Sequence, residues 1–63
     1  MLKLKTLGKR VKAARLKKGW TLDVLAAKTG FTKSFLSEME RSKKYPTLST
    51  LEIICKKLDE KLI

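Results

Sequence analysis

The sequence predicts a compact all-α domain, and three observations support this prediction. Apolar residues recur at steps of three and four, which is the period of an amphipathic helix. Glycines and helix-capping threonines divide the periodic segments into short pieces. The chain has 63 residues, enough for one small domain, and we expect residues 1–63 to form it.

The first predicted helix covers about residues 4–17. Its inward stripe consists of Leu4, Leu7, Val11 and Ala14. Gly19 follows as a stop signal, because glycine adopts the left-handed backbone of a helix end without steric cost.

Two shorter helices follow. Thr21 is a candidate N-cap for a helix that ends at Gly30, and Thr32 is the N-cap candidate for a third helix over about residues 33–41. The inward residues of the second helix are Leu22, Leu25, Ala26 and Thr29. The third helix has Phe35, Leu36 and Met39 on its inner face, and Lys33, Ser34, Ser37, Glu38 and Arg41 on its outer face.

A basic loop over residues 42–46 leads to the fourth predicted helix, which Thr47 caps. The apolar stripe of this helix consists of Leu48, Leu51, Ile54, Cys55 and Leu58. Leu62 and Ile63 leave room for a fifth helix that the chain does not complete. We therefore expect four to five short helices.

The charge of the chain is distributed unevenly. Residues 1–18 contain eight basic and no acidic side chains, residues 47–63 contain three of each, and the whole chain carries a net charge of +10. Such an excess attracts polyanions, with nucleic acid ahead of an anionic membrane surface. The alternative is a solvated face that only keeps the protein soluble.

The composition argues against several classes of protein. The chain has no histidine, and its one cysteine, Cys55, cannot form an internal disulfide or a four-ligand zinc site. Glu38 and Glu40 lie on different faces of one helix and do not form an acid–base pair. We expect no enzyme, no metal, no cofactor and no membrane span. The lack of disulfides favours a cytoplasmic location.

Residues 21–41 carry the pattern that indicates function. Two short helices meet at Gly30, with the small residue Ala26 one turn before it. Steeply crossing helices require a small side chain at their closest approach, and larger apolar side chains then lock the crossing. The polar outer face of the third helix is left free to enter the major groove of DNA.

Residues 7–58 resemble the Cro/C1-type (XRE, lambda repressor-like) helix-turn-helix family. The motifs in agreement are Gly-Lys-Arg at 8–10, Arg15, Leu25-Ala26, Gly30, Ser37, Glu40-Arg41 and Pro46-Thr47-Leu48. The stretch TLDVLAAKTGFTKSFLSEMER is similar to the N-terminal domain of cupin-linked regulators, and also to small phage-type and Bacillus-type regulators.

The resemblance implies a sequence-specific double-stranded DNA-binding transcriptional regulator, expected to be a repressor. It implies a homodimer on a palindromic operator in the bacterial cytoplasm, encoded by a bacterium or a phage. An antitoxin-like protein-interaction module with secondary DNA binding stays open as an alternative. A basic amphipathic segment on an anionic membrane is a further alternative, which the separate capped helices disfavour.

The resemblance also assigns roles to individual residues. The expected base-contacting residues are Lys33, Ser34 and Glu38. The expected phosphate-contacting residues are Thr21, Thr32, Ser37, Arg41, Lys43 and Lys44. Arg15 and Glu40 match a structural ion pair between the first and third helices. The alternatives are a solvated helix face for the base-contacting residues, capping alone for the two threonines, and unpaired surface charges for Arg15 and Glu40.

Two positions depart from the family pattern. Leu22 stands where the family often has a glutamine that binds a phosphate, so only backbone N–H groups remain for that contact. Ser42 stands where the family prefers glycine, which predicts a strained or differently capped end of the third helix.

Overall fold

The computed structural model describes residues 4–62, with side chains from residue 6 onward. The expectations for the side chains of Leu4 and Ile63 lie outside the described residues. The described part contains four helices and no strand: α1 (Leu4–Lys17), α2 (Leu22–Thr29), α3 (Lys33–Glu40) and α4 (Leu48–Leu58). The all-α prediction is confirmed.

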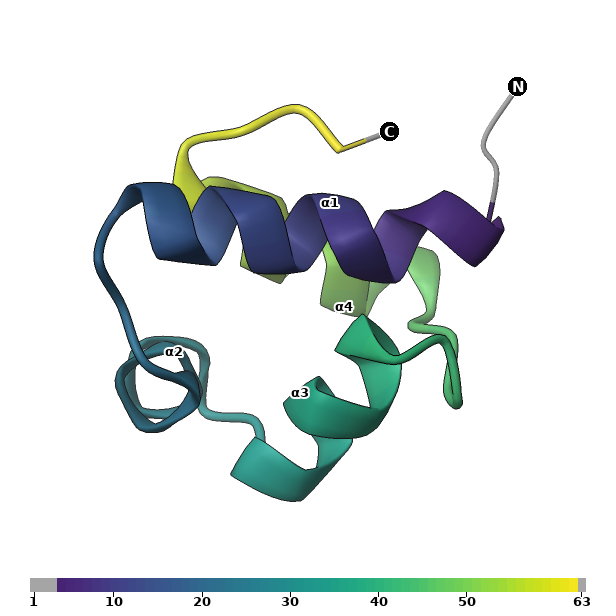
Figure 1. The fold of residues 1–63 in the computed structure, drawn as a ribbon, viewed down its shortest axis with the longest axis horizontal. Helices are drawn as coiled ribbons and strands as arrows, with labels where there is room; N and C mark the ends of the chain where they lie inside the picture. The colour runs from purple at the N-terminus through teal and green to yellow at the C-terminus, as the bar shows by residue number, and fades with distance from the viewer. Residues whose placement is uncertain (1–3, 63) are drawn as a thin grey trace.

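The helices enclose one apolar core. In Figure 1, α1 lies across the top of the molecule, α2 and α3 lie below it, and α4 passes behind it. Each helix contributes buried side chains, and the core consists of Leu7, Val11, Ala14, Leu25, Leu36, Met39, Leu51, Ile54, Leu58 and Leu62. Because α2 and α3 both pack into this core, their orientation to each other is set by the whole molecule.

The helix starts and the glycine stops agree with the sequence prediction. The hydroxyls of Thr21, Thr32 and Thr47 each accept a hydrogen bond from the backbone N–H three residues later. Gly19 and Gly30 have φ angles of 73° and 80°, in the left-handed region that favours glycine. These local signals determine where the loops before and after α2 begin and end.

The third helix ends at Glu40, one residue earlier than predicted. Ser42 takes the left-handed conformation, with φ at 61°, and the backbone N–H of Lys43 donates to the Glu38 carbonyl at 2.7 Å. The end of α3 therefore has the geometry of a glycine cap but holds a serine. Of the two alternatives predicted for this departure from the family pattern, the left-handed backbone of Ser42 agrees with a strained end and not with a different cap.

The prediction that Leu48 joins the inward stripe of α4 is wrong, since Leu48 is 62% exposed. It occupies the first position of α4, at the edge of the stripe, and the next apolar residue, Leu51, is buried in its place. Residues 59–62 form no helix, because Asp59 ends α4 in the left-handed conformation. Leu62 is nevertheless buried.

The segment after α4 returns to α1, as Figure 1 shows in yellow. Lys17 pairs with Glu60 at 3.3 Å, and Lys18 pairs with Asp59 at 3.2 Å. Over residues 4–62, no helix is long and apolar enough to cross a lipid bilayer.

Candidate nucleic-acid interface

The third helix is apolar on one side and open to solvent on the other. Leu36 and Met39 are fully buried, whereas Lys33 and Ser34 at its start are exposed. The predicted base-contacting residues Lys33 and Ser34 are thus free to meet a ligand, while the apolar side fixes the helix to the core. Glu38, the third of these residues, is half-buried.

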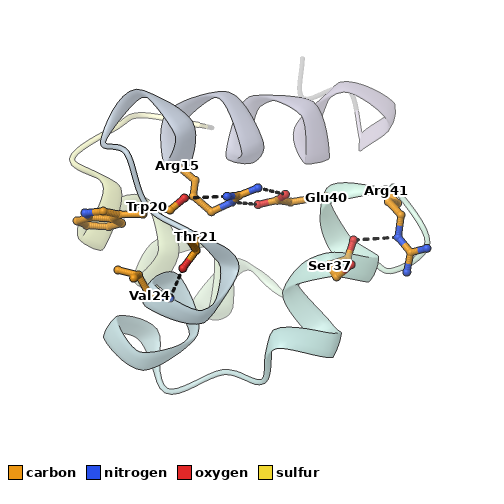
Figure 2. Close-up of polar contacts among 7 residues, drawn as sticks. All are labelled: Arg15, Trp20, Thr21, Val24, Ser37, Glu40 and Arg41. Carbon is orange, nitrogen blue, oxygen red and sulfur yellow. Dashed lines mark hydrogen bonds and ion pairs between the residues drawn. The ribbon is translucent and has the colours of Figure 1, made fainter.

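A buried ion pair joins α1 to the end of α3 (Figure 2). Arg15 donates from Nε to Glu40 Oε2 at 2.8 Å and from Nη2 to Glu40 Oε1 at 2.9 Å. A third bond runs from Arg15 Nη1 to the Trp20 carbonyl at 2.8 Å. Arg15 is only 7% exposed and Glu40 9%. The two carboxylate bonds make this a bidentate pair, the geometry that suits a buried guanidinium.

The hydrogen bonds to the Glu40 carboxylate raise the pKa of Arg15 above its ordinary value, against the opposing effect of burial, and the attraction between the charges adds to the rise. A basic group whose pKa is raised by folding stabilises the folded state fully at pH values below its unfolded-state pKa. This contribution is lost as the pH rises through the folded-state pKa. Arg15 therefore stays charged throughout the neutral and moderately alkaline range.

Gly8 forms a second contact between α1 and α3, which the sequence reasoning missed. A Cβ atom at Gly8 would overlap the Met39 carbonyl oxygen and would lie 2.6 Å from that of Glu40. Only glycine permits this approach. The available signal was the glycine itself, because glycine inside a helix is less stable than alanine by ~0.5–1 kcal/mol and needs a reason.

The Arg15–Glu40 pair lies between predicted phosphate-contacting residues. Figure 2 shows Thr21 on one side of the pair, and Ser37 and Arg41 on the other. Arg41 is exposed, and its Nε donates to the Ser37 carbonyl at 3.4 Å. In the first turn of α2, the Val24 N–H donates to the Thr21 hydroxyl at 3.2 Å, and the N–H groups before it have no acceptor within their own helix and are suited to an anion.

The remaining predicted contacts surround α3. Thr32 is exposed at its start, where its hydroxyl accepts the Phe35 N–H at 3.0 Å. Lys43 and Lys44 are exposed in the loop after α3. Lys44 Nζ lies 3.7 Å from Glu38 Oε1, so a predicted phosphate contact and a predicted base contact pair with each other.

Lys33 is also paired, with an acidic residue of α2. Its Nζ lies 3.4 Å from Asp23 Oδ2, in the first turn of α2. The two residues are ten positions apart, and no helical period relates them. Only the crossing of α2 and α3 brings them together.

Comparison with known proteins gives a consistent result. A model of the helix-turn-helix family matches residues 11–63. The immunity repressor protein of Bacillus phage phi105 is 41% identical over 49 residues, covering 78% of this chain and 34% of that protein. The HTH-type transcriptional regulator SinR of Bacillus subtilis is 41% identical over 54 residues, covering 84% of this chain and 49% of that protein.

Solved structures resemble the fold over most of the chain. SinR in complex with DNA superposes with a TM-score of 0.83 at 38% identity, covering 89% of this chain and 90% of that one. The restriction-modification controller protein C.Esp1396I, as a tetramer with its natural 35 base-pair operator, gives a TM-score of 0.84 at 33% identity, covering 92% and 76%. The chain spans about a third to a half of the length of the curated relatives that it matches.

Proposed function

The chain belongs to the helix-turn-helix family, and on that premise we propose that it is a sequence-specific double-stranded DNA-binding transcriptional regulator that acts as a repressor. One observation carries the proposal: the exposed polar face of α3 is backed by the fully buried Leu36 and Met39. A helix held in this way can enter the major groove as a rigid element. The likeness to a phage immunity repressor and to SinR supports the same function.

In this proposal the start of α3 contacts base edges. Lys33 donates to guanine O6 or N7, Ser34 bonds either to a donor or to an acceptor, and Glu38 accepts from cytosine N4. Phosphates are bound by the first-turn amides of α2 and α3 together with Thr21, Thr32, Ser37, Arg41, Lys43 and Lys44. These contacts set the register of the helix on the duplex, and the base contacts supply the specificity.

The Arg15–Glu40 pair and Gly8 have a supporting role in this mechanism. Both fix the end of α3 against α1. The angle at which α3 leaves the core is then the same before and after binding, so little conformational freedom is lost on the DNA.

We further propose a homodimer on a palindromic operator, with the recognition helices one DNA turn, ~34 Å, apart. Two copies with a charge of +10 each repel one another, but residues 47–63 are electrically balanced. A shallow groove on this part is lined by the exposed Ile53 together with Glu52 and Lys56. A patch that carries apolar, acidic and basic groups can pair with a copy of itself about a two-fold axis.

The proposal assigns no catalytic step to the chain and places it in the cytoplasm of a bacterium, encoded by the host or by a phage. Its test is a binding titration of a duplex selected from a random-sequence library against a scrambled duplex, at two salt concentrations. If a dimer meets ~10 phosphates, log affinity should fall with log salt at a slope of about −9. Equal affinity for both duplexes would overturn specific readout, and light scattering with and without DNA tests the dimer.

A further inference from the structure

The ion pair between Lys33 and Asp23 connects the starts of α2 and α3. Lys33 Nζ lies 3.4 Å from Asp23 Oδ2, and the side chains are 59% and 73% exposed. An exposed pair contributes little to folding stability. Its interest lies in its position, because Lys33 is the cation at the first residue of the proposed recognition helix.

Asp23 is a fixed negative charge on a surface proposed to bind a polyanion. It lies in the first turn of α2, where the amide N–H groups and the helix dipole favour a carboxylate. A carboxylate attracts the ammonium of Lys33 and repels a phosphate that approaches this ammonium. Both effects oppose contact between Lys33 and the DNA backbone.

We propose that Asp23 is a positioning residue for base readout, which holds the Lys33 ammonium at the start of α3 and keeps it off the phosphates. This inference rests on the proposed function. An ammonium has three N–H donors, so Lys33 can bond to Asp23 and to guanine O6 or N7 at the same time. Without Asp23, the flexible lysine stem lets the ammonium bind a phosphate, a contact that carries no sequence information.

The test measures a ratio of two affinities. Asp23→Asn keeps the size of the side chain and removes its charge. Binding is measured at one salt concentration to a duplex selected by the wild-type protein from a random library, and to a scrambled duplex of equal composition. We expect the affinity for the scrambled duplex to rise and the ratio to fall about tenfold, equivalent to ~1.4 kcal/mol. Circular dichroism checks that the variant is folded.

Asp59→Asn is the matched control. Asp59 is also an exposed aspartate paired with a lysine, Lys18 at 3.2 Å, but it lies at the end of α4. Asparagine accepts the left-handed backbone of this position, where φ is 54°. Removing the charge of Asp59 makes the protein more positive overall. This should raise the affinities for both duplexes by the same factor and leave their ratio unchanged. An equal fall in the ratio for both variants would overturn the inference in favour of a net-charge effect.

A double variant tests the route through Lys33. In a Lys33→Ala background, Asp23→Asn should no longer change the ratio, because the residue that it positions is absent. A full effect in that background would overturn the positioning role. If Asp23→Asn leaves the ratio unchanged while the wild type still discriminates, only this inference is wrong. If the wild type itself binds both duplexes equally, the proposed function fails with it.

Discussion

The two ends of α3 are held in opposite ways. Its last residue, Glu40, is buried and bonded twice to Arg15, and the neighbouring backbone touches Gly8. Its first residue, Lys33, is exposed and makes one longer contact to Asp23. The same type of interaction, a pair of opposite charges, therefore fixes the fold at one end and leaves a side chain available to a ligand at the other. The two pairs differ in burial and geometry. This difference predicts that substitutions at the end of α3 lower folding stability, whereas substitutions at its start change binding.

The largest expected effect is the loss of stability in Glu40→Ala, because it leaves the Arg15 guanidinium buried without its carboxylate. Removing one partner of a buried pair destabilises by ~3–5 kcal/mol, and ~3–9 kcal/mol is the total expected for a chain of this length. Thermal unfolding followed by circular dichroism measures the change. A melting temperature equal to that of the wild type would contradict a structural role of the pair.

The control for this variant is Glu60→Ala. This variant also removes an ion pair, but the partner is the exposed Lys17, at 3.3 Å. The free energy of unfolding should therefore change by no more than ~1 kcal/mol.

Gly8→Ala should have the next largest effect. The added Cβ would overlap the Met39 and Glu40 carbonyl oxygens, and we expect a net loss of ~1–3 kcal/mol in spite of the better helix propensity of alanine. Urea denaturation gives the free energy of unfolding. Lys9→Ala, at the exposed neighbouring position, should be neutral or slightly stabilising. If Gly8→Ala proved more stable than the wild type, the tight contact between α1 and α3 would be wrong.

Ser42→Gly should raise stability by ~0.5–1 kcal/mol, because glycine takes the left-handed backbone at φ 61° without strain. The same change in the middle of the helix, Ser37→Gly, should lower stability by ~0.5–1 kcal/mol. Melting temperatures of the two variants should therefore move in opposite directions. A decrease for both would show that the backbone of Ser42 is not strained.

Lys33→Ala should have the smallest effect on folding, within ~0.5 kcal/mol, since the lost pair is exposed. Its effect should appear in binding instead, as a loss of ~1–3 kcal/mol of preference for the selected duplex over the scrambled one. Unfolding and binding titrations on one sample separate the two quantities. A large drop in melting temperature would mean that the start of α3 is structural, like its end.

The local features of this protein could be predicted from the sequence. The caps at Thr21, Thr32 and Thr47 and the stops at Gly19 and Gly30 depend on hydrogen bonds and dihedral angles within a few residues. Helix periodicity, which is also a local property, predicted most of the core. It failed at Leu48, the first residue of α4, which is exposed. The Arg15–Glu40 pairing was expected only through the family resemblance.

The tertiary structure alone decided which distant residues meet. Gly8 permits a contact with carbonyl groups more than thirty positions away, and Asp23 meets Lys33 because two helices cross. Neither partner can be found from periodicity, because the direction in which one helix crosses another depends on packing summed over the whole core. The chain by itself determined its helices, their ends and its excess of positive charge. The packing of those helices decided which charged side chains are buried and which stay in solvent.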